Sequence, residues 1–280
     1  MNQEATNLQQ RWDSFLTKID DRFQELLTQS ATILPQLLDY QDFDTLPFNN
    51  AWTGIESQAK DLISKIDQTW ADKVSKDWET IQETEEALLV KAEVSLEDFH
   101  QHFYALYYSE RDKGYLLMRK LEKDLRNYEI STFAAAGRKL QAKAQEILSG
   151  NFSCSQCMAQ LPVQQSFYRS YYQVCLYCQT TNTFEPGTIA RNIEHFALHP
   201  LAEEKALPAY WQYWELLHQY KLQREDGPGT IAEEQVINAF TTYVDVYLHA
   251  RIAIIPDYKN RYEEDRAGKI AHLRRNTLCS

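Results

Sequence analysis

The chain has 280 residues, of which 44% are hydrophobic and 25% are charged, and its formal net charge is −11 at pH 7. This hydrophobic share excludes a chain that is disordered throughout, and the negative charge opposes non-specific binding to phosphate backbones. Eight glycines and eight prolines are few for this length, which favours long helices with short connections over strands and turns.

The first half of the chain shows helical periodicity almost throughout. Apolar residues recur at steps of three and four from Leu8 to Leu27, which predicts one long amphipathic helix. The polar stretch from Gln41 to Asn50 is interpreted as a connection. A second apolar stripe, with about 3.6 residues per step, predicts a straight helix. It consists of Trp52, Ile55, Ala59, Leu62, Ile66, Trp70, Val74, Trp78 and Ile81.

Two serines indicate where further helices begin. Ser95 followed by Asp98 resembles a capping box, in which the two side chains satisfy free backbone amides at a helix start. Ser131 is expected to open another segment that ends at Gly150, a residue suited to a helix C-cap. Residues 1–149 are therefore predicted to form a bundle of about four helices.

The last third of the chain, residues 188–280, is predicted to be a C-terminal helical region. Thr188 and Thr230 each follow a Pro-Gly pair and are expected to be helix N-caps. Pro208 and Pro256 are expected to open or kink further helices, because proline lacks the amide that continues a helix.

Four of the five cysteines form the pattern C-x2-C-x17-C-x2-C, which is the spacing of a four-cysteine metal site. They are Cys154, Cys157, Cys175 and Cys178. The residues at the start lack the features of a signal peptide, and no apolar run is long enough to span a membrane. We therefore expect a cytoplasmic protein, in which thiols stay reduced and paired cysteines favour a metal ion over disulfides.

The segment between the two cysteine pairs has the character of a β-hairpin. Residues 166–174 are rich in aromatic side chains and read as a strand, and residues 179–184 are its expected partner. This arrangement resembles the zinc-ribbon class of modules, which implies a small central β zinc ribbon at residues 150–187 with one structural Zn²⁺. Zinc ribbons usually carry glycine directly after the second cysteine of each pair, where this chain has Met158 and Gln179.

Four cysteine ligands leave no coordination position for water or substrate, so the predicted site is closed and structural. An iron–sulfur cluster or a single iron would use the same ligands and stays open as an alternative. A redox-active Cys-x-x-Cys is not favoured, since the neighbouring sequence lacks the alternation of strands and helices that such a motif needs.

Two Glu-x-x-His units, Glu97 with His100 and Glu215 with His218, resemble half of the ligand set of a di-iron helical bundle. Glu86 and Glu194 are the candidate additional carboxylates. His195 and His199 are spaced to share a helix face and are interpreted as surface or capping residues, because Pro200 is expected to end the helix there. Phosphate-binding loops, dinucleotide fingerprints and nucleophile elbows do not occur, so catalysis is not expected.

Two aromatic clusters leave two interpretations open: packing of the ribbon against helices, and contact with another protein. Base stacking would need a basic groove, whereas residues 151–187 contain only Arg169 and Glu185 as charged side chains. The clusters are Phe167, Tyr168, Tyr171, Tyr172 and Tyr177 on the ribbon, and Tyr210, Trp211, Tyr213 and Trp214 further along.

Taken as a mainly α protein with these features, the chain is expected to be a non-catalytic zinc-ribbon scaffold or adaptor that binds other proteins in a larger cytosolic assembly. Two alternatives remain: a zinc-ribbon protein associated with nucleic acid, and a di-iron metalloenzyme. The net negative charge disfavours the first. The sequence makes no prediction of the oligomeric state.

Overall fold

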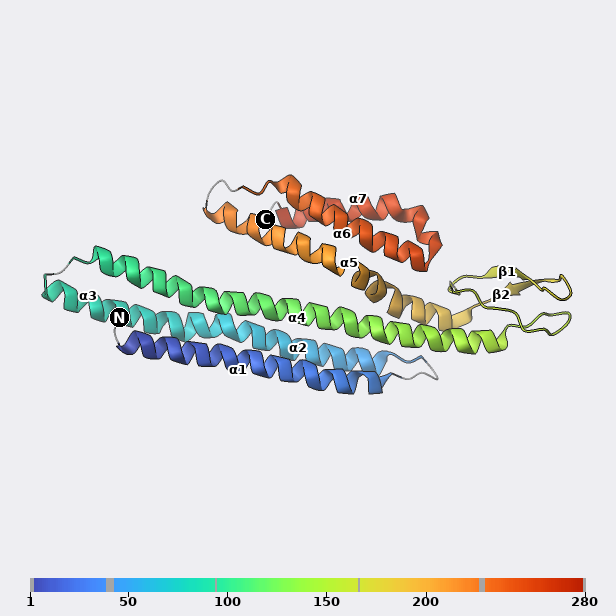
Figure 1. Ribbon diagram of the computed structural model, residues 1–280, viewed down its shortest axis with the longest axis horizontal. Coiled ribbons are helices and arrows are strands. Elements are labelled where there is room, and N and C mark those ends of the chain that lie inside the picture. The colour runs from blue at the N-terminus through green and yellow to red at the C-terminus, as the bar shows by residue number, and fades with distance from the viewer. Residues whose placement is uncertain (1–2, 39–42, 94, 166, 227–229, 279–280) are drawn as a thin grey trace. The chain divides into compact units, whose positions relative to one another are not determined.

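The computed structural model describes residues 3–38, 43–93, 95–165, 167–226 and 230–278. The protein is mainly helical, as predicted, with one small antiparallel sheet of two strands (Figure 1). It divides into two compact units, one of residues 1–37 and 46–128 and the other of residues 38–45 and 129–280. Within the described ranges, none of the helices has both the length and the apolar character that crossing a bilayer requires. The domain boundaries at 149 and 187 remain predictions.

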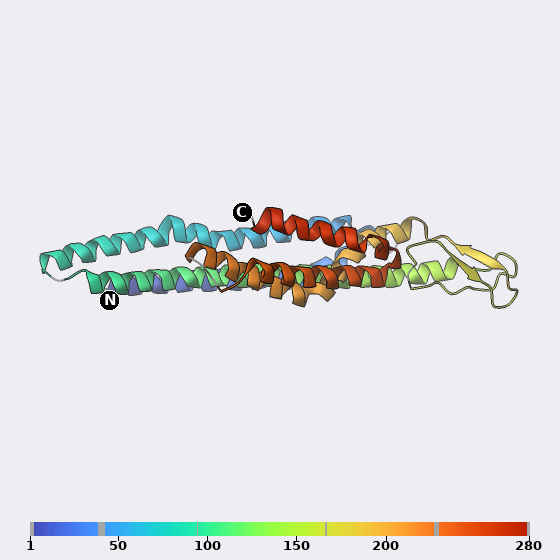
Figure 2. The ribbon, with the colours of Figure 1, turned by 90° about the horizontal axis from the view of Figure 1, so that it is seen from above.

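The first unit is built from antiparallel helical rods. Helix α1 (Gln3–Ile33) runs into a short 3₁₀ turn, η1 (Leu34–Leu37). Helix α2 (Leu46–Thr69) continues through η2 (Trp70–Val74) into α3 (Ser75–Lys91), and the first part of α4 (Glu97–Asn151) completes the unit. Figures 1 and 2 show α2, η2 and α3 as one unbroken rod beside α1.

The turn η2 is a π-helix, which the prediction of a straight helix did not include. The spacing of the apolar stripe explains this π-helical turn. Four consecutive steps of four residues connect Leu62, Ile66, Trp70, Val74 and Trp78. An α-helix has about 3.6 residues per turn, so such a run would drift off the core-facing side. One π-helical turn absorbs the extra residue and keeps the later residues buried.

Tryptophan side chains fill the core of the first unit. Trp12 is 2% exposed, its indole Nε1 donates to the backbone oxygen of Glu110 over 2.9 Å, and its ring centroid lies 5.5 Å from that of Trp70. Glu110 is buried as well, and its carboxylate accepts from Gln9 and pairs with Lys113. Because these groups hydrogen-bond to one another, a polar network is tolerated at the centre of the bundle.

The predicted start of a new helix at Ser131 is wrong, because Ser131 lies inside helix α4. The helix runs without interruption from Glu97 to Asn151. Buried apolar positions continue on both sides of Ser131, with Leu125 and Ile130 before it and Ala134 and Leu140 after it. A single serine is only mildly unfavourable inside a helix, so the continuing apolar face outweighs its preference for a helix start.

The second unit contains the last part of α4, the strands β1 (Tyr171–Val174) and β2 (Thr181–Phe184), and the C-terminal helices. These helices are α5 (Gly187–Asp226), α6 (Glu233–Ile254), the 3₁₀ turn η3 (Pro256–Arg261), α7 (Tyr262–Leu273) and the π-helical turn η4 (Arg274–Leu278). Helices α5 and α6 share a core in which small alanines face tyrosines and aliphatic side chains. Its buried members are Ala202, Ala206, Tyr243, Val244, Tyr247 and Leu248.

Two predictions about the C-terminal helices are corrected. Helix α6 begins at Glu233 rather than beside Thr230, because the Gln235 side chain accepts from the backbone amide of Ala232 and caps the helix there. Pro208, expected to open or kink a helix, lies inside α5 and therefore does not open it. Pro200 does not end the helix, because its neighbours Ala197, Leu198 and Ala202 are buried and their packing carries the helix through it. Pro256 does open a helical turn, η3.

The close approach of α4 to α1 and α2 predicts that Gly114 cannot be enlarged. A methyl group at Gly114 would lie 2.8 Å from Trp12 Cζ2 and 3.3 Å from Ile66 Cγ2. Gly114→Ala should lower the free energy of unfolding by up to about 2 kcal/mol, because the cost of overpacking, about 1–3 kcal/mol, offsets or exceeds the gain in helix propensity of about 1 kcal/mol. Gly54→Ala, where nothing lies within 4 Å, should raise it. Urea denaturation of both variants measures the difference, and equal stabilisation would contradict the packing described.

Candidate metal centre

The four cysteines lie on two turns with the same backbone hydrogen bonds. In the first knuckle (residues 154–159), the amide of Met158 donates to the oxygen of Cys154 over 3.0 Å, and the amide of Cys154 donates to the oxygen of Ala159 over 2.8 Å. The second knuckle (residues 175–180) repeats both bonds, from Gln179 to Cys175 over 3.0 Å and from Cys175 to Thr180 over 2.9 Å. Each turn therefore directs both of its cysteines to the same side.

The residue after the second cysteine has a left-handed backbone in both knuckles. The φ angle is 61° at Met158 and 62° at Gln179. These are the two positions where zinc ribbons usually have glycine, and the chain makes the same turn without it. A side chain with this backbone conformation costs about 1 kcal/mol relative to glycine. Both residues are exposed, so the cost is not offset by burial of their side chains.

A hairpin brings the two knuckles together. Strands β1 and β2 pair antiparallel with Tyr171 opposite Phe184 and Val174 opposite Thr181, so the second knuckle is the turn between them. The predicted strand at residues 166–174 is shorter than expected, since pairing begins only at Tyr171. The first knuckle is closed beside it by a bridge between Ser153 and Gln160.

The four sulfur atoms converge on one point. All four lie within 4.8 Å of one another. The Sγ atoms of Cys154 and Cys178 are 3.4 Å apart, and those of Cys157 and Cys175 are 3.6 Å apart. A metal ion with four sulfur ligands at about 2.3 Å would place each pair of sulfurs about 3.8 Å apart. The arrangement is thus close to the tetrahedron that such an ion requires, and these thiols could bind a metal ion.

Asn182 supports the site from strand β2, and the sequence analysis did not identify it. The side chain is 6% exposed. Its Nδ2 lies 3.6 Å from Cys154 Sγ, and its Oδ1 accepts from the amide of Ser155 over 2.8 Å. Asn182 thereby ties the first knuckle to the hairpin of the second. The available signal was a polar residue on the inward-facing side of a short strand, next to the buried Phe184.

The surroundings of the thiols shift their pKa values in opposite directions. Backbone hydrogen bonds from Cys157 and Gln156 lower the pKa of Cys154 to about 6, against the opposing effect of burial. For Cys157, the Ala159 amide lowers the pKa, but the Cys178 thiol, burial and the other two thiols together raise it to about 12. Several thiolates this close repel one another. All four thiols can be ionised at once only with a cation at the centre of the cluster.

The hairpin is attached to the helices of its own unit by aromatic and ionic contacts. Phe167 and Tyr168 are buried, and Gln141 of α4 donates to the Tyr168 hydroxyl over 2.5 Å. Arg169 forms a two-pronged ion pair with the buried Glu194 of α5, at 2.8 and 3.0 Å. Tyr258 also donates to Glu194, over 3.2 Å. The one basic side chain of residues 151–187 is therefore engaged by a carboxylate.

The ribbon aromatics divide into two groups. Phe167, Tyr168 and Tyr171 face the interior of the unit, where Tyr171 stacks on Phe184 at 4.8 Å between ring centroids. By contrast, Tyr172 and Tyr177 are 77% and 82% exposed. Packing against the rest of the unit therefore accounts for the first group, and contact of the second group with another protein stays a prediction. Of the later cluster, Tyr213 is buried in a core between α5, α6 and α7.

The remaining candidate ligands do not form a second cluster. His100 contacts Glu86 at 2.8 Å, and His199 contacts the Tyr247 hydroxyl at 2.8 Å. Glu215 accepts from Gln219 on its own helix, and His195 is exposed. In the part of the chain that the structure describes, the four cysteines are the one group of three or more histidine, cysteine or acidic side chains close enough to hold a metal. Cys279 lies outside the described residues.

Comparison of the chain with protein-family models, with curated proteins and with solved structures finds no match. The chemistry of the cysteine cluster is therefore derived from its own geometry. That geometry consists of two matching turns, four converging sulfurs and a buried amide that hydrogen-bonds one of them.

The left-handed backbone at Gln179 predicts opposite effects for two substitutions. Gln179→Gly should strengthen metal binding a few-fold, because glycine removes about 1 kcal/mol of strain from the turn. Gln179→Val should weaken it by more than that factor, because a β-branched side chain fits this conformation worst. Competition with a chromophoric chelator measures both affinities. Thr183→Gly, at an exposed strand position with ordinary backbone, is the control and should bring no gain. A gain with Thr183→Gly equal to that with Gln179→Gly would rule out strain as the cause.

Proposed function

We propose that Cys154, Cys157, Cys175 and Cys178 hold one structural zinc ion, and that the protein is a non-catalytic scaffold or adaptor whose zinc ribbon contacts other proteins. The convergence of the four sulfurs within 4.8 Å is the observation that carries the proposal. Zinc favours four thiolates in a tetrahedron and leaves no open position in such a site, which suits a structural role. The binding free energy, on the order of 10–16 kcal/mol, stabilises a segment too small to have its own core.

The surface of the ribbon supports a role in protein contact. Four large apolar side chains near its tip are 72–82% exposed: Met158, Tyr172, Leu176 and Tyr177. Their neighbours carry almost no charge, since Arg169 is paired with Glu194 and Ser170 donates to Glu185. Exposed aromatic and methionine side chains without charge are typical of protein interfaces. A nucleic-acid partner would require free basic side chains, which this ribbon lacks.

Elemental analysis of the purified chain tests the metal. The expected result is one zinc per chain and no iron, with the zinc lost in Cys154→Ser and in Cys178→Ser. Iron in place of zinc would support the alternative iron site instead. Metal beyond one ion per chain would favour a metalloenzyme.

Removal of zinc with a chelator should then unfold residues 152–186 and leave α1 and α6 intact, because the hairpin lacks a core of its own whereas these helices pack in theirs. Hydrogen exchange read by mass spectrometry separates the two parts. Slow exchange throughout the hairpin after complete zinc removal would show that the ion does not hold its fold.

The contact role of the ribbon predicts that partners are lost when its tip is made polar. The double variant Leu176→Ser and Tyr177→Ser should keep its zinc, since both side chains point into solvent at 80% and 82% exposure. Cross-linking in the native cell followed by mass spectrometry should recover fewer partners with it. Leu222→Ser, at an exposed position on α5, is the matched control. An identical set of partners for all three proteins would argue against the ribbon as an interface.

A further inference from the structure

Strand β1 has one edge that the hairpin leaves open. In the register of the hairpin, the amide of Cys175 donates to the oxygen of Thr180 over 2.9 Å, which makes these two residues a hydrogen-bonded pair. Hydrogen-bonded and non-hydrogen-bonded pairs alternate along an antiparallel ladder. The backbone N–H and C=O groups of Tyr172 and Val174 therefore point away from β2. Across the described residues, no backbone group outside the hairpin bonds to them.

Strand β2, by contrast, is attached to the first knuckle. The Asn182 side chain, in the middle of β2, accepts from the amide of Ser155 over 2.8 Å. The Thr180 hydroxyl, just before β2, donates to the side-chain oxygen of Gln156. No hydrogen bond of this kind joins the first knuckle to residues 171–174 within the ranges that the structure covers. Strand β1 is therefore the edge at which a further strand can be added.

Strand β1 lacks the features with which proteins protect an open edge. Edge strands that stay unpaired usually carry lysine, proline or a bulge, and Tyr171–Val174 contain none of these. Tyr172 and Val174 instead expose their side chains, by 77% and 45%, on one face of the sheet. Leu176 continues this row at the same two-residue spacing and is 80% exposed. The row is uncharged and leads onto the tip that is proposed above as a contact surface.

We infer that an extended segment of a partner protein adds to β1 as a third strand, with its main chain hydrogen-bonded to Tyr172 and Val174. Its side chains on the exposed face contact Tyr172, Val174 and Leu176, so aromatic or β-branched residues at alternate positions fit best. The inference rests on the proposed function, which makes the ribbon a contact surface, and it adds the way in which the partner binds.

Charge and geometry favour a partner segment over a second copy of the chain. Each chain has a formal net charge of −11, so two copies repel each other. Antiparallel pairing of Tyr172 in one copy with Val174 in the other would set Leu176 beside Ser170, and the two tips would point apart. Pairing of two four-residue strands is also small beside the ~1,200–2,000 Å² that a stable interface buries. An extended partner segment can instead follow β1 and continue over the tip.

An NMR titration of the isotope-labelled, zinc-loaded full-length protein tests the inference. The probe is a peptide of about seven residues, a usual strand length, with alternating threonine and valine around a central tyrosine. It is N-methylated at every second residue, so that only one of its edges can donate hydrogen bonds. The control peptide has the same side chains and is N-methylated at every residue.

The probe should shift the amide signals of Tyr172 and Val174 and bind about tenfold more tightly than the control peptide, because the control lacks the amides that pair with β1. Equal affinities of the two peptides would overturn the inference. Larger shifts at Thr181 and Thr183 than at Tyr172 and Val174 would place the added strand on β2 and overturn the proposed edge.

Two matched proline variants locate the added strand. Tyr172→Pro and Thr183→Pro each remove one outward-facing amide, on opposite edges of the hairpin, and neither removes a hydrogen bond between β1 and β2. Tyr172→Pro should weaken binding of the probe about tenfold, and Thr183→Pro should leave it unchanged. Elemental analysis verifies that both variants keep their zinc. Equal binding by the two variants would overturn the proposed edge. The comparison of the two peptides needs no variant, so it decides the inference even if a proline variant loses its zinc.

Two further outcomes would show that the inference is wrong. If analytical ultracentrifugation finds a dimer that Tyr172→Pro abolishes, the strand added to β1 belongs to a second copy of the chain. If the double variant Leu176→Ser and Tyr177→Ser loses partners while the probe does not bind the unmodified chain, the ribbon is an interface without strand addition. In that second case the proposed function stands and this inference alone fails.

Discussion

Mutual repulsion among four thiolates is the constraint on which the cysteine cluster of this protein depends. Their sulfur atoms lie within 4.8 Å of one another, and two of them are fully buried. Neutral thiols can share this space, but four thiolates cannot unless a cation balances their charge. The backbone amide of Gln156 and the side-chain amide of Asn182 both donate to the sulfur of Cys154, which stabilises negative charge on that atom. Metal binding as proposed for this site would exceed the cost of the left-handed backbone at Met158 and Gln179 by an order of magnitude.

Much of this structure could be predicted from spacing alone. The apolar stripes from Leu8 to Leu27 and from Trp52 to Ile81 both lie on long helices with buried faces. The spacing of the cysteine pairs predicted that four sulfurs would converge, and they do. Both signals are local and periodic, and they depend on side-chain types that have few alternative uses in a folded chain.

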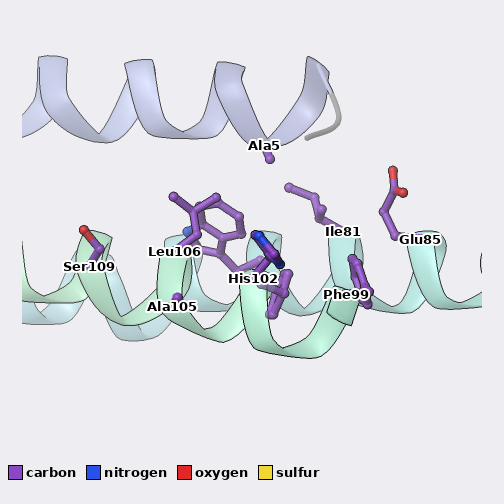
Figure 3. A pocket seen from close by; sticks show the side chains of 10 residues that line it. Ala5, Ile81, Glu85, Phe99, His102, Ala105, Leu106 and Ser109 are labelled. Atoms are coloured by element: carbon purple, nitrogen blue, oxygen red, sulfur yellow. The ribbon is translucent and has the colours of Figure 1, made fainter. Parts of the chain in front are cut away.

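The errors came where packing outweighs local preference. Ser131 and Pro200 are signals for helix boundaries, yet buried neighbours on both sides carry each helix through them. The role of Asn182 was missed because it depends on a contact between residues far apart in the chain. The cavity lined by residues of α1, α3 and α4 (Figure 3) could not be anticipated either. Its lining residues repeat at the same spacing as ordinary core positions, so the sequence does not distinguish them from a filled core.

The unequal exposure of the four cysteines sets the path by which an ion would enter or leave. Cys154 and Cys175 are closed off from water, whereas Cys157 is exposed and Cys178 is partly so. If an ion is bound, Cys157 is therefore the cysteine that a competing ligand could reach most directly. The two buried sulfurs would keep hold of the ion until the hairpin itself opens. The lifetime of the bound ion would then be governed by the kinetics of local unfolding rather than by affinity alone.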